Sequence, residues 1–235
     1  MKTILLSTVG FMGLTALTAM PMAYAESSRP EIKDNSGIAL KPANGAKQGF
    51  FYEAFASPQQ EGGEESDTPA NTPAQFKSTT PSTPREQRKD RAQAVLTFSK
   101  DLSRAYFHMA IKNIDVSQIN MMHIHCGKPG QLGPILIDFS LIGNLQSYFA
   151  DNEIHITLYN QDITDVTDSS DGSLIDAFTV GCPILKEIPQ DRVKTIGGMK
   201  TIADEGQLYI NLHTTGQTYY GDVRGMFYPV AVETK

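Results

Sequence analysis

Residues 121–139 read MMHIHCGKPGQLGPILIDF, and this stretch decides the fold. Its first part alternates, so Met122, Ile124 and Cys126 share one face of a strand while His123 and His125 share the other. The glycines and prolines that follow form a turn, because glycine permits positive φ and proline stops strand pairing. A second strand, 134–139, leaves the turn. The stretch therefore predicts a strand, a corner and a returning strand.

The same alternation of apolar and polar residues continues through the second half of the chain. Short apolar–polar alternations separated by turn residues are typical of an all-β sandwich or barrel. We expect strands at 50–56, 94–100, 104–112, 121–126, 134–139, 153–159, 173–180, 207–213 and 222–230. One segment, 190–206, places apolar residues near helical spacing and predicts a short helix, although Gly197-Gly198 weakens it.

The N-terminal half is organised differently. Residues 1–25 combine Lys2, an apolar run and Ala23-Tyr24-Ala25, the pattern of a secretory signal peptide cleaved after Ala25. A transmembrane anchor is the weaker alternative because the run is short and closed by Pro21. Residues 26–48 are expected to form a flexible tail. Residues 57–90 are rich in Pro, Ser, Thr, Glu and Gln, so we expect a disordered insert in a β domain spanning 49–232.

Charge and cysteine content narrow the class of protein. The chain has 235 residues and a formal charge of −6, and removing the signal peptide takes away one lysine, giving −7. This charge argues against nucleic acid or an anionic membrane as partner. In an exported protein, Cys126 and Cys182 are expected to form a disulfide. The alternative makes Cys126 a thiolate metal ligand beside the histidines.

Several polar residues share the faces opposite the apolar rows. These are His123, His125, His155, His213, Asp222 and Arg224. One interpretation is a solvated face with cross-strand hydrogen bonds and an Asp222–Arg224 pair. The other is a metal site. Histidines at i and i+2 have Cα atoms roughly 6.7 Å apart, so His123 and His125 can converge on one ion, with His213 as third ligand if its strand is adjacent. Imidazole suits copper or zinc.

Two segments resemble the CHRD domain, a repeat first described in chordin and found also in bacterial exported proteins. HIHCGKPGQLGPILIDF (123–139) resembles that family's histidine-rich strand and Gly-Pro turn, and LYINLHTTGQTYYGDVRGMF (208–227) resembles its closing segment. Asp222 replaces the family's usual Glu, and FFYEAFASPQQEG (50–62) is similar to its opening strand. The resemblance implies an immunoglobulin-like antiparallel β-sandwich. It also implies a non-catalytic extracellular or periplasmic binding or structural module whose ligand the family does not define.

The family's histidine positions correspond to His123, His125 and His213, whereas His108 and His155 match no motif of the family. The His-x-His pair and the Gly-rich turn also resemble copper–zinc superoxide dismutase. Ile135, however, follows Gly133-Pro134 where that family carries a further histidine, so a dismutase-like enzyme is the weaker alternative. No Gly-x-Ser-x-Gly elbow supports a hydrolase. The sequence thus favours a non-enzymatic exported module, with copper or zinc binding as the alternative.

Overall fold

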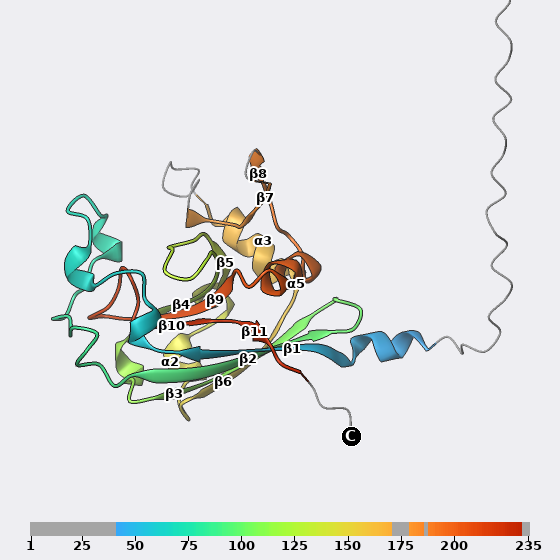
Figure 1. Ribbon diagram of the computed structural model, residues 1–235, viewed down its shortest axis with the longest axis horizontal. Helices are drawn as coiled ribbons and strands as arrows, with labels where there is room; N and C mark the ends of the chain where they lie inside the picture. The colour runs from blue at the N-terminus through green and yellow to red at the C-terminus, as the bar shows by residue number, and fades with distance from the viewer. Residues whose placement is uncertain (1–40, 171–178, 186–187, 232–235) are drawn as a thin grey trace, which may run out of the picture. The chain divides into compact units, whose positions relative to one another are not determined.

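The computed structural model describes residues 41–170, 179–185 and 188–231 (Figure 1). The expected signal peptide, most of the expected tail and most of the expected strand at 173–180 lie outside these residues. Of that strand, Val180 forms an isolated parallel bridge with Ile135. Among the described residues, no helix has the length and apolar character needed to cross a membrane.

Two antiparallel sheets form the sandwich that the alternation predicted. The first has the order β11-β1-β2-β3-β6 and the second the order β10-β9-β4-β5, and Figure 1 shows them as two layers. We call them sheet A and sheet B. Sheet A contains β1 (Gln48–Ala56), β2 (Arg91–Ser99), β3 (Ala105–Lys112), β6 (Glu153–Leu158) and β11 (Tyr228–Pro229). Sheet B contains β4 (Ile119–Cys126), β5 (Ile135–Asp138), β9 (Leu208–Thr214) and β10 (Val223–Met226), and a separate ribbon pairs β7 (Pro183–Leu185) with β8 (Ile188–Arg192).

The core lies between the two sheets and is built from the apolar rows. Alternate residues of each strand point inward, so the rows Met122–Ile124 and Leu208–Ile210–Leu212 of sheet B face those of sheet A. Buried contributors from sheet A include Leu96, Phe98, Phe107, Met109 and Ile154. The polar row of β4 and β9 consequently lies on the side of sheet B away from this core.

Helices cap the sandwich in more places than the sequence indicated. The expected helix within 190–206 is α5 (Ile196–Asp204), in which Thr195 caps the N-terminus by accepting a hydrogen bond from the Gly198 N–H. The helix α3 (Asn160–Asp168) was not expected; it buries Ile163 and Val166 and packs near β5. Two single turns, α1 (Phe139–Ile142) and α2 (Leu145–Tyr148), follow β5.

Residues 57–90 differ most from the expectation of disorder. They follow a defined path with short 3₁₀ turns η2 (Pro58–Gln60), η3 (Glu65–Asp67) and η4 (Ala74–Phe76). The N–H groups of Thr79 and Thr80 donate to the carbonyl of Thr215, and the Glu65 carboxylate accepts from the N–H groups of Tyr219 and Tyr220. The cyan segment in Figure 1 lies beside the red loop that joins β9 and β10. Polar hydrogen bonding replaces the apolar burial that the composition lacks.

The end of the expected tail is also ordered against the fold. The turn η1 (Pro42–Ala46) precedes β1, and the N–H groups of Lys100 and Asp101 donate to the carbonyls of Lys47 and Gly45. The remaining 3₁₀ turn, η5 (Val116–Gln118), leads into β4, and its N-cap Asp115 accepts from the Ser117 N–H. The described part of the chain thus begins in contact with the β2–β3 turn.

Candidate metal centre

Three histidines meet on the outer face of sheet B. His123 and His125 come from β4, and His213 comes from the adjacent strand β9, where it pairs in register with Met121. The ring centroid of His123 lies 5.2 Å from that of His125 and 5.2 Å from that of His213. One ring nitrogen from each of the three lies within 4.8 Å of the others. The adjacency that a shared site requires is therefore present.

These histidines are buried, whereas one of the two interpretations of the polar row made it a solvated face. Their exposed fractions are 5% for His123, 8% for His125 and 5% for His213. The solvated-face interpretation is wrong because a second layer of chain covers this side of sheet B. That layer comprises the turn 127–134, the β9–β10 loop and parts of 57–90 that hydrogen-bond to that loop.

Each ring has one buried nitrogen without a partner, and in two of the three rings a backbone carbonyl holds the other nitrogen. Nδ1 of His125 donates to the Gly133 carbonyl at 2.9 Å, and Nδ1 of His213 donates to the Thr218 carbonyl at 2.9 Å. A carbonyl oxygen can only accept, so both protons sit on Nδ1 and both Nε2 atoms carry lone pairs. Nε2 of His123 lies 3.8 Å from the Asp138 carboxylate. Nδ1 of His123 and Nε2 of His125 and His213 are buried without a hydrogen-bond partner.

Burial also fixes the protonation state of the cluster. Desolvation lowers the pKa of His125 to about 3 and that of His213 to about 4, and it holds the pKa of His123 well below its ordinary value. Repulsion between the rings lowers the pKa of His123 and His125 further. All three imidazoles are neutral at pH 7, which is the form that binds a metal.

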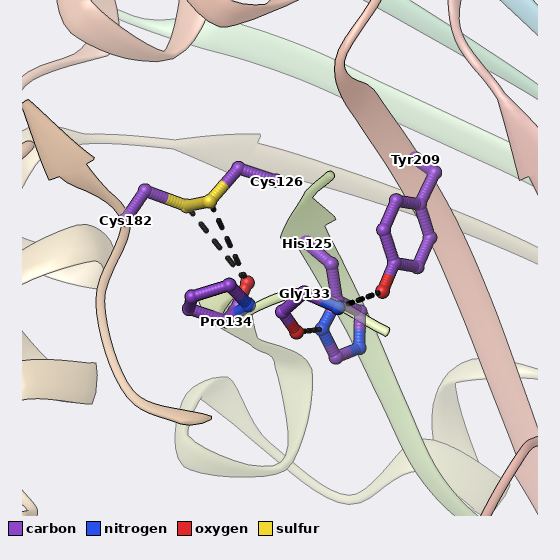
Figure 2. The surroundings of a disulfide bond; sticks show 6 residues. All are labelled: His125, Cys126, Gly133, Pro134, Cys182 and Tyr209. Carbon is purple, nitrogen blue, oxygen red and sulfur yellow. Dashed lines mark hydrogen bonds between the residues drawn. A yellow bond between two sulfur atoms is a disulfide. The ribbon is translucent and has the colours of Figure 1, made fainter. Parts of the chain in front are cut away.

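The turn 127–134 positions His125, as Figure 2 shows. The Gly133 N–H donates to the Tyr209 hydroxyl at 3.0 Å while the Gly133 carbonyl accepts from His125. A Cβ on Gly133 would lie 1.7 Å from the Cys126 carbonyl oxygen, so only glycine fits. Cys126 and Cys182 form the expected disulfide, with Cα atoms 6.0 Å apart, which excludes Cys126 as a thiolate ligand. Both sulfur atoms rest against the Pro134 carbonyl, and the turn is thereby tied to the β7 region.

A stack of three side chains supports the same turn from the sheet. The Tyr209 ring is parallel to His125, with centroids 4.8 Å apart, and the Arg224 guanidinium lies 3.6 Å from the Tyr209 centroid. Arg224 is fully buried and donates to the carbonyls of Gln131 and Lys128. Arg224 therefore links β10 to the turn that orients His125.

Asp222 and Arg224 do not form the expected pair. Asp222 instead pairs with Arg88, from the segment expected to be disordered, with Nη1 and Oδ1 3.1 Å apart and both side chains buried. Burial, with the negative charge of Asp90 beside it, raises the pKa of Asp222 to about 6. Glu61 is buried near these arginines, and desolvation raises its pKa well above the ordinary value. The pairing mistake arose because sequence offers no sign that 57–90 folds back onto β10.

Other residues of the centre were missed for different reasons. Asp138 ends β5 and pairs in register with His123, and Tyr209 shares the face of His213 by strand alternation, so both had a usable signal. Gly133 and Thr218 accept hydrogen bonds through their backbone carbonyls. Every residue has such a carbonyl, so the residue type does not indicate this role. His108 and His155 lie on sheet A, on strands β3 and β6, and take no part in this centre.

The family model for the CHRD domain matches residues 72–227, which include β2 to β10 and all three buried histidines. The match starts within 57–90, so β1 lies before it, although β1 pairs with β2 in sheet A. No curated protein and no solved structure matches the chain. On this match over about two thirds of its length, the chain belongs to the CHRD domain family.

Proposed function

We propose that this CHRD domain is an exported, non-catalytic module that binds one copper or zinc ion through His123, His125 and His213. One observation carries the proposal: three neutral imidazoles each leave a buried ring nitrogen without a partner, and these rings gather in one place. A buried polar atom without a hydrogen bond costs about 1–3 kcal/mol. A metal ion bonded to all three lone pairs removes that cost.

The surroundings of the rings are those that metal-binding histidines have in proteins. Such histidines donate their second N–H to a carbonyl or a carboxylate, which fixes the ring and the tautomer. Gly133 and Thr218 supply the carbonyls, and Asp138 supplies the nearby carboxylate. Ligation at about 2.0–2.1 Å requires the rings to approach one another from their present separation. Three imidazoles suit copper and zinc.

Enclosure favours a binding role over catalysis. Each histidine is less than one-tenth exposed, and Tyr209, Arg224 and the turn 127–134 lie against the cluster. A catalytic metal keeps a position open to water or substrate. A closed site instead holds its ion for storage, delivery or stabilisation of the fold.

Export is the second part of the proposal. The Cys126–Cys182 disulfide supports it, since disulfides persist in oxidising compartments. The signal-like sequence at 1–25 supports it independently. N-terminal sequencing of protein recovered from the periplasm or medium should start at Glu26. An uncleaved chain in the cytoplasm with two free thiols would contradict this part.

Metal titration of untagged protein tests the binding itself. The background should lack the exposed histidines His108 and His155, so that only the buried centre is counted. We expect one equivalent of Cu(II) or Zn(II). His213→Ala should weaken binding by at least about 100-fold, since even loss of a group that only hydrogen-bonds a metal ligand costs 10–100-fold. Binding that is unchanged by both His123→Ala and His213→Ala, in variants that keep their native circular dichroism, overturns the proposal.

A further inference from the structure

A second group of histidines lies on the opposite side of the molecule. His108 on β3 and His155 on β6 face each other across the outer surface of sheet A, where the two residues are direct register partners. Glu153 lies two residues before His155 on β6, so its side chain emerges on the same face. Neither the family motifs nor the buried centre involves these three residues.

The three side chains converge on one point. Oε2 of Glu153 lies 3.4 Å from Nε2 of His108 and 3.6 Å from Nε2 of His155. The two imidazole rings are stacked, with centroids 4.0 Å apart and planes 11° from parallel. One ligand atom from each residue lies within 4.8 Å of the other two. The same carboxylate oxygen therefore lies within 3.6 Å of a ring nitrogen of each histidine.

The backbone beneath this group is held firmly. Met109 and Ile154, which pair with each other one step along the same strands, are buried in the core on the other face of the sheet. Sliding one strand by a residue would expose that core row, so the register between His108 and His155 is fixed. The group is preorganised by strand pairing, and only side-chain rotations separate it from a compact ligand set.

We propose that His108, Glu153 and His155 form a second, solvent-exposed site for a divalent transition-metal ion such as Zn(II) or Cu(II). Two imidazoles and one carboxylate are a donor set that these ions accept, with water in the remaining positions. The side chains are 41%, 52% and 68% exposed for His108, Glu153 and His155, so the ion would exchange freely with solvent. His108 and His155 also line a surface hollow of about 470 Å³, which leaves space for water or a small ligand on the metal.

The test counts exposed and buried sites separately in the full chain without an affinity tag. Zn(II) is titrated by calorimetry into wild-type protein, His155→Ala, Glu153→Gln and the buried-centre variant His213→Ala. The matched control is Glu53→Gln. It removes a carboxylate on β1 of sheet A that accepts a hydrogen bond from Gln93 on β2. We expect the control to bind as the wild type does.

The expected outcome is one fewer rapidly exchanging equivalent in His155→Ala and at least about tenfold weaker binding of that equivalent in Glu153→Gln. His213→Ala should keep this equivalent, so failure of the buried centre and failure of the exposed site are distinguishable. The inference is overturned if His155→Ala retains wild-type stoichiometry. It is equally overturned if Glu53→Gln loses as much binding as Glu153→Gln, since the ion would then respond only to surface charge.

Discussion

At the scale of single residues, backbone groups of the turn 127–134 fix the orientation of the buried His125 ring. The Gly133 carbonyl fixes the His125 ring, and the absence of a Cβ on Gly133 allows that carbonyl to reach it. Sequence could predict which three histidines gather, because the i, i+2 spacing and the strand alternation can be read from the residue types. It could not predict that the rings are buried, since burial here depends on a turn and a distant segment.

Gly133→Ala should destabilise the protein. The added Cβ would lie 1.7 Å from the Cys126 carbonyl oxygen, which belongs to backbone and cannot rotate away. Overpacking of this kind costs about 1–3 kcal/mol, measured by urea unfolding. Gly197→Ala is the matched control: its Cβ would meet nothing closer than 3.7 Å within helix α5, so it should stabilise by up to about 1 kcal/mol. Equal effects of the two substitutions would contradict the close approach at Gly133.

Acid should destabilise the metal-free protein through its buried histidines. The folded pKa values of His125 (about 3) and His213 (about 4) lie below the ordinary value of 6.5. Below pH 6.5 the unfolded chain takes up protons that the folded protein refuses, so the free energy of unfolding falls as pH drops toward 4. The slope is on the order of 1.4 kcal/mol per pH unit for each histidine.

Comparison with a variant isolates this effect. Asp222 acts in the opposite sense, because its raised folded pKa of about 6 lets the folded protein take up a proton between pH 6 and 4. Subtracting the pH profile of His213→Asn from that of the wild type removes the contribution of Asp222. Between pH 6 and 4.5 the variant should take up one proton fewer on unfolding than the wild type does. Parallel profiles would show that His213 is accessible to protons in the folded state.

At the scale of elements, strand alternation predicted most of the sandwich and composition misjudged 57–90. Strands β2, β3, β4, β5, β6 and β9 formed where alternation placed them, because the apolar face of each packs into the core. Helix α3 was missed since only Ile163 and Val166 anchor it. The segment 57–90 is ordered by hydrogen bonds to loop backbone, such as those that the Glu65 carboxylate accepts, and by the ion pair of Arg88 with the Asp222 carboxylate. Amino-acid composition carries no information on such long-range partners.

Arg88 should anchor that segment to the sandwich. Arg88→Gln leaves Asp222 buried without its cationic partner, and breaking a buried pair costs about 3–5 kcal/mol. Hydrogen exchange at the Thr79 and Thr80 amides, which donate to Thr215, should accelerate as the segment loosens. Arg85→Gln is the control, because its ion pair with Glu64 is partly exposed and is worth at most about 1 kcal/mol. Equal acceleration in both variants would argue against a specific anchor.

At the scale of the whole molecule, one disulfide closes the loop that contains β5, β6 and α3. Cys126 and Cys182 are 56 residues apart, and closing such a loop stabilises the fold by about 4 kcal/mol in the chain-entropy model. Reduction of the native protein should therefore lower the free energy of unfolding by about that amount. It should also weaken metal binding, because the bridge rests on the carbonyl of Pro134 next to Gly133. Unfolding curves that coincide with and without reductant would contradict this role.

The central claim is that His123, His125 and His213 ligate one metal ion together. The X-ray absorption spectrum of the one-equivalent zinc complex, prepared without a tag and in the background lacking His108 and His155, tests it most directly. We predict three imidazole nitrogens at about 2.0–2.1 Å from the zinc, and one imidazole fewer in His213→Ala. A first shell made only of oxygen atoms, or a spectrum unchanged by His213→Ala, would contradict the claim.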